Sequence, residues 1–329
     1  MKIKVIGAGL AGCSCARLLA DAGFNVEIHE KNEFIGGLCS DEDESGVFQH
    51  YGPHIFHTSN PDVIRFVLRF SEWVPFCNRP IAVTKNGFAR LPFSSETICD
   101  IKKKPLEEFL SFSDEEKKQI IFDNVIKDYS LKQWGEIPNE GVLARIRASV
   151  GLGASYFNDL FEGLPKYGFT KMFKTMLDHE KITLKLNSDE KPDGLTVWTG
   201  PIDELDCPVK IKWHGTKFVR SNYDLFGKRL TAVYNHNDEA LFGTRSTKMK
   251  MLTGCDCEDI LIEIPRSSDG KHYAVVSDRE RGQIDEWIRE KEKEGLWLCG
   301  RSATARYLDM DDVIEQAFEV SKKIIERRA

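Results

Sequence analysis

The sequence has no apolar run that approaches the roughly 18 residues of a membrane-spanning helix. It also has no internal repeat and no low-complexity segment, and no signal peptide precedes the strand-like residues at its start. These absences argue against a membrane partner. We therefore expect a cytoplasmic protein.

Excess positive charge and metal-binding cysteine pairs are also missing. The net charge is −6, which argues against nucleic acid or an anionic membrane as the main partner. The nine cysteines are scattered, and the C-x-C pairs Cys13/Cys15 and Cys255/Cys257 have no second pair at the spacing of a zinc site. We interpret them as reduced thiols and predict no bound metal.

The first forty residues carry the strongest signal in the sequence. Ile3–Ile6 predict a strand, a glycine-rich turn follows, and Ala11–Ala22 predict a helix that ends at Gly23. A second strand is predicted over Asn25–His29. This order of strand, turn, helix and strand is typical of the βαβ unit that binds a dinucleotide.

Gly7, Gly9 and Gly12 give this turn a G-x-G-x-x-G pattern. The first glycine makes the tight turn, the second lets the backbone approach a pyrophosphate, and the third packs the helix on the strand. Glu30 follows the second strand, where a carboxylate accepts a hydrogen bond from a ribose hydroxyl. A glycine-rich turn without a ligand is the alternative, but the βαβ context favours a dinucleotide site. The neighbouring residues expected to contact this ligand are Leu10, Ala11 and Lys31.

Two further features favour FAD over NAD as the dinucleotide. The Gly36–Gly37 pair after the second strand lets the chain run beside an extended FAD. Near the C-terminus, the predicted strand Leu296–Gly300 is followed by a loop and by a helix from about Val313 to Arg327. FAD folds bring the N-terminus of such a helix to the flavin. Both ends of the chain are therefore expected to build one nucleotide-binding domain, with the middle inserted.

Six sequence blocks, in this order, resemble the UDP-galactopyranose mutase family. They are GPHIFHT, NRPIAVTKNG, YSLKQWG, YFNDLFEGLPKYG, TGPID and RYLDMD. The resemblance extends from Met1 to about Ala317 and weakens in roughly 204–230 and 247–266. It implies an α/β fold, in which an FAD-binding Rossmann-like domain carries an inserted helical bundle and an antiparallel β-sheet domain.

The domains implied by the resemblance are discontinuous. The FAD-binding domain comprises residues 1–75, 160–206 and 292–329. Residues 93–159 form the helical substrate-loop domain, and residues 76–92 together with 207–291 form the sheet domain.

Local patterns in the middle of the chain agree with this division. The turn Lys85–Gly87 predicts a β-hairpin. Ser113-x-x-Glu116 is a capping signal for the start of a helix. Short alternating segments within 209–280 predict a twisted antiparallel sheet.

The resemblance implies an enzyme that interconverts the six-membered and five-membered ring forms of a nucleotide-linked sugar. FAD must be reduced, yet no reductant is consumed overall, because N5 of the flavin forms a covalent adduct with the sugar while the nucleotide leaves and returns. UDP-galactose is the first expected substrate, and UDP-arabinose or a related nucleotide stays open. A homodimer also stays open.

Two histidines are expected at the flavin by the same resemblance. His54 would pack near the ring and His57 beside N5, with Gly52 and Pro53 forming the bend that returns both side chains. A buried histidine pair bonded to backbone carbonyls is the alternative. The other residues expected to contact the flavin are Ile55, Arg301, Tyr307, Asp309 and Met310.

Arg245 is expected to clamp the diphosphate of the substrate, because a planar guanidinium suits phosphate oxygens. With His54, His57 and Arg301 it forms the expected catalytic set. Tyr129 would stack on the base, although a helix-packing aromatic is the alternative for it and for Trp134. The other residues matched to substrate binding are Trp134, Tyr156, Asn235, Tyr273, Tyr307 and Asp309.

The sequence departs from the family before Tyr156. Seven residues upstream, the family has a second phosphate-binding arginine, but this chain has Ser149. Arg147 either replaces that arginine from a shifted loop or faces solvent. The chain is also shorter than its relatives, and Ala305 stands where an aromatic residue is frequent. These departures bear on the substrate and less on the type of reaction.

Two other functions stay open from the sequence alone. An FAD-dependent amine oxidase or desaturase shares the fold superfamily, but it has no use for the Tyr129/Trp134 block or for Arg245 and Asn235. A non-catalytic flavoprotein is supported only by Ser149.

Overall fold

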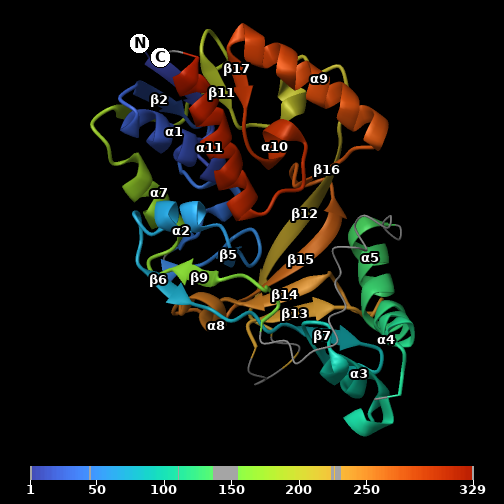
Figure 1. Cartoon of the computed structure of the whole chain (residues 1–329). Coiled ribbons are helices and arrows are strands. Elements are labelled where there is room, and N and C mark those ends of the chain that lie inside the picture. Colours follow the sequence, from blue (N-terminus) through green and yellow to red (C-terminus); the bar gives the residue numbers. More distant parts are fainter. Residues whose placement is uncertain are drawn as a thin grey trace.

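The computed structural model describes residues 2–43, 46–109, 111–135, 155–223, 226 and 231–327. Its two halves are built on two sheets, and the chain ends lie together at one side of the molecule (Figure 1). In the described residues, no helix is both long and apolar enough to cross a bilayer. No group of three metal-ligating side chains occurs among these residues either.

A five-stranded parallel sheet forms the first half, in the order β10-β2-β1-β11-β17. Its strands are β1 (Lys2–Ile6), β2 (Asn25–His29), β10 (Ile182–Lys185), β11 (Thr196–Trp198) and β17 (Leu296–Leu298). Strands from both ends of the sequence therefore share one sheet, which confirms the predicted Rossmann-like arrangement.

Alternating residues of this sheet enter two separate cores. Val5 and Val197 pack in one core with α1 (Leu10–Asp21), α7 (Phe169–Leu177) and α11 (Met310–Glu326). The neighbouring residues Ile6, Trp198 and Leu298 pack in another core with α9 (Asp278–Glu294). Since successive strand residues point to opposite faces, helices cover both sides of the sheet.

The predicted elements at the chain ends are correct in kind, with shifted bounds. Strand β2 has the predicted limits, whereas α1 begins and ends one residue earlier than expected. Helix α11 begins at Met310 after the cap Asp309, as the matched RYLDMD block implies, and about three residues before the Val313 of the apolar pattern, because Asp309 and Asp312 form a capping box. The predicted loop after β17 is wrong in part, since Arg301–Thr304 form the short helix α10.

A seven-stranded sheet forms the second half, in the order β16-β12-β15-β14-β13-β7-β8. Its strands are β7 (Ile81–Thr84), β8 (Gly87–Arg90), β12 (Lys212–Ser221), β13 (Val233–His236), β14 (Arg245–Lys248), β15 (Ile260–Ser267) and β16 (Tyr273–Val275). The predicted hairpin at Lys85–Gly87 is β7–β8. The prediction of a purely antiparallel sheet is wrong at one place, because β13 pairs with β7 in parallel.

Helices flank the seven-stranded sheet on one side (Figure 1). They are α3 (Ser95–Lys102), the 3₁₀ turn Leu106–Phe109, α4 (Asp114–Ile121), the π-helical turn Phe122–Ile126 and α5 (Lys127–Trp134). Ser113 caps α4 in a capping box with Glu116, as predicted. Helix α5 packs beside β15, which brings its aromatic residues to the sheet.

A small three-stranded sheet lies between the two halves. It pairs β5 (Phe56–Thr58) with β9 (Phe161–Pro165), and β9 with β6 (Trp73–Pro75). The remaining elements are α2 (Pro61–Val67), the hairpin strands β3 (Glu42–Asp43) and β4 (Gly46–Val47), α8 (Met249–Thr253), and 3₁₀ turns at Gly37–Cys39 and Ile202–Glu204.

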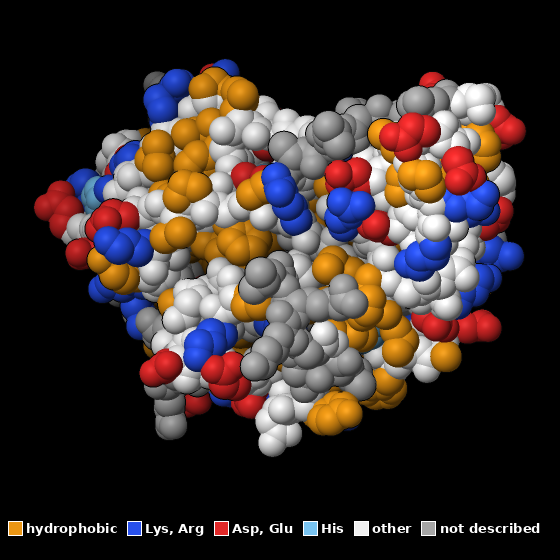
Figure 2. Space-filling view, turned by 90° about the horizontal axis from the view of Figure 1, so that it is seen from below, with side chains coloured by type: hydrophobic (Ala, Val, Ile, Leu, Met, Phe, Trp, Pro, Cys, Tyr) orange, Lys and Arg blue, Asp and Glu red, His pale blue; other side chains and the backbone are white. Residues whose placement is uncertain are grey.

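The expected domain boundaries stay predictions, with one exception. The boundary between residues 291 and 292 falls inside α9, which packs on β17 of the five-stranded sheet. Seen from below, a notch separates two lobes of the surface, and basic and acidic side chains stand beside it (Figure 2).

Candidate functional site

One large cavity connects the glycine-rich turn with the seven-stranded sheet. It has a volume of about 2000 Å³. A pocket for a single small ligand usually measures about 300–1000 Å³. The cavity is therefore large enough for an extended dinucleotide and a second ligand together.

The three glycines of the turn differ in what a side chain at each position would contact. Gly7 has a φ of +99°, and a Cβ there would lie 2.2 Å from Thr199 Oγ1. A Cβ on Gly12 would lie 1.8 Å from the carbonyl oxygen of Gly7. Gly9 differs, because its Cβ would meet nothing closer than 3.8 Å, at Gly36 and Gly37. The fold requires Gly7 and Gly12, whereas Gly9 keeps open a space that the protein itself does not fill.

This open space adjoins the start of α1. Gly9 is the N-cap of the helix, no side chain caps it, and its first turn has no acidic residue. Free N–H groups at a helix N-terminus bind phosphate groups. Glu30 is buried nearby and is held by the backbone N–H groups of Ala8 and Asn32, both at 2.9 Å. The residues present therefore fit the pyrophosphate and ribose of a dinucleotide.

The next part of the cavity is formed by Gly36, Gly37 and the start of α11. Both glycines have positive φ, and Gly36 forms a bridge with Gly9. Cys39 lies 4.0 Å from the sulfur of Met310 and lines the cavity. Burial raises the pKa of the Cys39 thiol to about 12, so Cys39 is not a nucleophile at neutral pH.

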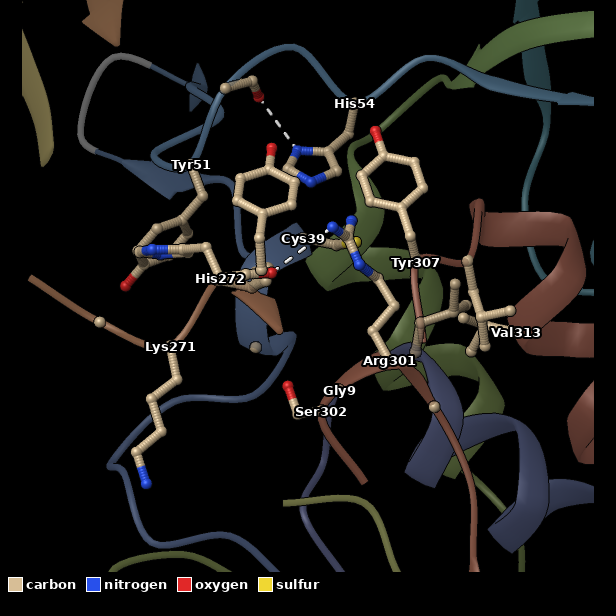
Figure 3. A pocket seen from close by; sticks show the side chains of 18 of the residues that line it. Gly9, Cys39, Tyr51, His54, Lys271, His272, Arg301, Ser302, Tyr307 and Val313 are labelled. Atoms are coloured by element: carbon tan, nitrogen blue, oxygen red, sulfur yellow. Dashed lines mark hydrogen bonds between the residues drawn. The ribbon is translucent and has the colours of Figure 1, made fainter. Parts of the chain in front are cut away.

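His54 enters the cavity as a neutral ring. Its backbone is fixed on both sides by the amide of Gln49, and its Nδ1 lies 3.0 Å from the Gly52 carbonyl oxygen. Burial lowers the pKa of His54 to about 4, against the Gly52 hydrogen bond, which raises it. Figure 3 shows the ring near the side chains of Arg301 and Tyr307. Ile55 also lines the cavity.

His57 lies on β5 and lines the same cavity. Its Nδ1 is 2.8 Å from Asp159 Oδ2, and the ring of Phe157 stacks on it at 3.8 Å. Phe157 in turn makes an edge contact with Tyr156. This chain of contacts connects His57 with the residues around Arg245.

Arg301 begins α10 and is held by two tyrosines. Its guanidinium lies 5.1 Å from the Tyr273 ring and 4.8 Å from the Tyr307 ring, and the two rings stack on each other. Cation–π contacts of this kind fix a guanidinium without neutralising its charge. Burial raises the pKa of Tyr273 above its ordinary value, so it is a hydrogen-bond donor at neutral pH.

Arg245 is the centre of the second part of the site. Its Nε donates to Asn235 Oδ1 at 3.3 Å, one terminal nitrogen donates to the Tyr129 hydroxyl at 3.2 Å, and the other lies 3.5 Å from Glu263. Asn235 and Arg245 are direct partners on β13 and β14. Burial opposes the charge of Arg245, but Glu263 and the surrounding tyrosines outweigh burial and raise the pKa of the guanidinium.

The predicted residues mostly converge on the cavity. Its lining includes Gly7, Gly9, Leu10, Ala11, Glu30, Lys31, Trp134, Tyr156, Asn235, Arg245, Tyr273, Arg301, Tyr307, Asp309 and Met310. The hydroxyl of Tyr129 accepts a hydrogen bond from Arg245, and Gly12 packs against Gly7. Arg147 and Ser149 lie outside the described residues.

Several residues of the site were missed by sequence reasoning. Glu263 lies in β15, a region where the family resemblance is weak, although a single acid in the apolar run ILIEI is a signal for it. Phe157 and Asp159 were missed beside Tyr156. His272 was missed beside Tyr273, and its imidazole accepts from the Thr216 amide at 2.9 Å.

Comparison with known proteins agrees with this geometry. The sequence model described as UDP-galactopyranose mutase matches residues 124–307, and a model of an NAD(P)-binding Rossmann-like domain matches residues 5–70. A probable UDP-galactopyranose mutase of Klebsiella pneumoniae is 28% identical, over 98% of this chain and 94% of the relative. A dTDP-fucopyranose mutase of Escherichia coli is 29% identical, over 98% of each chain.

A solved structure of reduced UDP-galactopyranose mutase has the same fold. It superimposes with a TM-score of 0.76 over 99% of this chain and 96% of the other, at 15% sequence identity. The match of the family's sequence model to more than half of the chain decides the relationship. The chain belongs to the UDP-galactopyranose mutase family.

Proposed function

We propose that this protein is a reduced-FAD-dependent mutase that interconverts the pyranose and furanose forms of a sugar on a nucleoside diphosphate. The observation that carries the proposal is the single cavity that joins a dinucleotide cradle to the Arg245 cluster. A cofactor held at one end and a diphosphate held at the other would meet in the middle, where His54, His57 and Arg301 lie.

FAD fits the cradle better than a nicotinamide dinucleotide. The Gly36–Gly37 segment runs beside Gly9 and extends the cradle toward Met310 and the start of α11. When bound and reduced, the flavin supplies the nucleophile for the sugar ring, and the protein supplies binding and orientation.

Arg245 would hold the diphosphate when it leaves the sugar and until it returns. Asn235, Tyr129 and Glu263 fix the guanidinium from three directions, so that it is oriented before a ligand arrives. An anchored guanidinium that faces a cavity binds phosphate oxygens strongly. Tyr156, Tyr273 and Tyr307 add hydroxyl groups around the same space.

His54, His57 and Arg301 would act between the two ends. Neutral His54 adds no charge to the cavity, whereas Arg301 adds a fixed positive charge held between two rings. A fixed cation there favours the diphosphate and the electron-rich reduced cofactor. His57 would line the reacting edge of the flavin, where Asp159 and Phe157 set its orientation.

The second candidate is an FAD-dependent amine oxidase or desaturase. The two partly buried arginines of the cavity disfavour it, because Arg245 and Arg301 would repel a cationic amine and would receive no polar partner from an apolar lipid. A flavoprotein without catalytic activity is the third candidate.

The identity of the sugar is a narrower proposal. The relatives include a UDP-galactopyranose mutase and a dTDP-fucopyranose mutase at 28% and 29% identity, so similarity does not separate the two sugars. We take UDP-galactose as the first substrate, with UDP-arabinose and dTDP-fucose as the next to test. We also propose a cytoplasmic location, since the buried cysteines Cys13, Cys15, Cys39, Cys255 and Cys299 are thiols without a disulfide, and light scattering would test for a homodimer.

The deciding assay uses dithionite-reduced protein with UDP-galactofuranose, UDP-arabinofuranose and dTDP-fucofuranose, followed by chromatography. We expect the pyranose form from one of them, and no product from the oxidised protein. Equal activity of the oxidised protein would exclude this use of the flavin. Oxidation of an amine, with flavin turnover, would establish the second candidate.

A further inference from the structure

His57 is held by a carboxylate that itself has a fixed position. Asp159 Oδ2 lies 2.8 Å from His57 Nδ1, and Asp159 Oδ1 accepts from the Ser59 hydroxyl at 2.6 Å. Ser59 Oγ accepts in turn from the Leu160 backbone N–H at 3.2 Å. Both oxygens of the carboxylate are therefore used, and the group cannot turn away from the imidazole without losing a second bond.

The surroundings of His57 leave one ring atom for the cavity. Phe157 covers one face of the imidazole at 3.8 Å, with an angle of 14° between the rings. In the described part of the chain, the only hydrogen bond of the ring is the one from Nδ1, while the residue lines the cavity. Nε2 is thus the atom left for a ligand.

Among the residues that the structure describes, the charged groups that face His57 come from two segments. Asp159 lies in the segment before β9. Asp311 lies at the start of α11, where its side chain forms a hydrogen bond with Thr58 and interacts electrostatically with His57. Glu162, the β9 partner of His57 in the sheet, is directed elsewhere, because its oxygens bond the Asn78 amide and Ser155.

We propose that Asp159 is a positioning residue that keeps the proton of His57 on Nδ1 and presents the Nε2 lone pair to the cavity. An ionised carboxylate can only accept hydrogen bonds, so the nitrogen that faces it must carry the proton. In a neutral imidazole the other nitrogen is then an acceptor. His54 has a related arrangement with the neutral carbonyl of Gly52, whereas the charge of Asp159 makes the preference at His57 stronger.

This inference deepens the proposed function and rests on it. If His57 lines the reacting edge of the flavin, an acceptor at Nε2 favours the reduced cofactor, because its reacting nitrogen carries a hydrogen. The oxidised cofactor has a lone pair at that nitrogen and would face another lone pair. Asp159 would therefore stabilise the reduced state that the proposed mutase needs.

The first experiment measures the tautomer directly. The FAD-loaded protein is labelled with ¹⁵N-histidine, and its spectrum is recorded at about pH 8, above the ordinary histidine range. His57→Gln identifies the signals of His57. We expect a proton on Nδ1 and none on Nε2 in the wild type, and a majority of the Nε2–H form in Asp159→Ala. A doubly protonated ring, an Nε2–H ring in the wild type, or an unchanged tautomer in Asp159→Ala would overturn the proposal.

Matched variants separate this role from a general loss of structure. Asp159→Glu keeps the carboxylate and should keep the Nδ1–H form. Asp62→Asn changes an exposed carboxylate on α2 and should leave the spectrum unchanged. Thermal unfolding of each variant is recorded first, and a variant that fails to fold is replaced by Asp159→Asn, whose amide can also donate and so should relax the preference.

The second experiment measures the midpoint potential of the bound flavin. We expect Asp159→Ala to decrease the ratio of reduced to oxidised flavin about tenfold, which is a negative shift of about 30 mV for a two-electron couple. Asp159→Glu and Asp62→Asn should stay at the wild-type potential. An active mutase with an unchanged potential in Asp159→Ala would overturn the stabilisation of the reduced flavin by Asp159 and leave the proposed function standing. A protein that binds no FAD, yet holds His57 as predicted, would overturn the proposed function and not the tautomer.

Discussion

The two ends of the cavity are built in different ways. The dinucleotide cradle uses backbone groups from the first forty residues, namely the turn before α1 and the Gly36–Gly37 segment. The Arg245 cluster uses side chains from α5, β13, β14 and β15, which come from distant parts of the sequence. A backbone site depends on glycine spacing, whereas a side-chain site depends on the packing of the whole sheet.

The two ends also differ in charge. The cradle offers a helix N-terminus without a cationic side chain in the first turn of α1. The opposite end offers the guanidinium of Arg245, with Glu263 as the acid that faces it. The cradle therefore suits a cofactor that stays bound, and the arginine cluster suits a diphosphate that must be released and recaptured.

Gly9→Glu should have the largest effect, because it should abolish FAD binding at the cradle without changing the rest of the cavity. The missing Cβ of Gly9 leaves space that the fold does not use, so the variant should fold. Its carboxylate would fill the path of the pyrophosphate and repel it. We expect a colourless protein with no FAD released on denaturation, measured by absorbance.

The matched control for this variant is Gly282→Glu on α9. Gly282 has no heavy atom within 4 Å of the position of a Cβ. It should retain FAD at the wild-type level. Full FAD occupancy in Gly9→Glu would show that the cradle is not the cofactor site.

Arg245→Ala should weaken nucleotide binding at the other end of the cavity without affecting FAD binding at the cradle. It removes a charge-assisted contact of on the order of 2–4 kcal/mol, so UDP should bind roughly thirty-fold more weakly or worse. Calorimetry measures this loss, and the FAD content should stay unchanged. Arg279→Ala changes an exposed arginine on α9 and should not alter either ligand.

Arg147→Ala tests whether one arginine or two arginines bind the diphosphate. A loss similar to that of Arg245→Ala would mean that two arginines hold the diphosphate, as the family pattern implies. Unchanged UDP affinity would leave Arg245 as the clamp and direct attention to ligands with fewer phosphates, which UMP binding would reveal. If neither variant changes nucleotide affinity, the substrate is not bound at this end.

The sheet behind Arg245 should be sensitive to acid through His236. This buried histidine has Nδ1 2.8 Å from the Phe242 carbonyl oxygen and Nε2 3.0 Å from Ser246 Oγ, and burial lowers its pKa from 6.5 to about 4. Between these values the unfolded chain binds a proton that the folded chain does not. The free energy of unfolding should therefore fall as the pH decreases from 6.5 to 4, by roughly 3 kcal/mol at most.

Urea unfolding across that pH range measures this effect. His236→Gln should make the free energy of unfolding depend less steeply on pH. The contribution of His54, whose pKa is also about 4, should remain. Identical slopes in the variant and the wild type would contradict a neutral buried His236.

Lys132→Met should give the smallest effect, again confined to the arginine end. Lys132 lies on α5 and donates to the carbonyl oxygens of His236, Asp238 and Leu241. Burial lowers its pKa to about 8, so it is still mostly charged at neutral pH. Loss of these bonds should loosen α5 and cost about 1 kcal/mol of UDP binding, without loss of FAD. The exposed Lys127→Met is the control, and equal affinities in both variants would contradict a role for Lys132.

The cradle could be predicted from the sequence because its causes are local. Gly12 packs on Gly7 and Glu30 accepts from the Ala8 amide within one βαβ unit, and the positive φ of Gly7 is local too, although its missing Cβ also makes room for Thr199 from outside the unit. The start of helix α11 at Asp309 and Met310 was expected from the RYLDMD block, whereas the apolar pattern alone placed it about three residues later, at Val313.

The arginine cluster could be predicted only in part. The family blocks identified Arg245, Asn235 and Tyr129, but Glu263 depends on the register of β14 against β15, which no local pattern encodes. The parallel pairing of β7 with β13 was missed for the same reason, since these strands are far apart in the sequence. Asp159 reaches His57 only because β5 pairs with β9.

Turnover per reduced flavin is the most direct test of the central claim that the flavin acts without net oxidation. The protein is reduced, freed of excess reductant and mixed anaerobically with an excess of UDP-galactofuranose, or of the furanose found active in the assay above. We predict many molecules of pyranose per flavin, with the flavin still reduced at the end by its absorbance spectrum. At most one product per flavin, together with an oxidised flavin, would contradict the account.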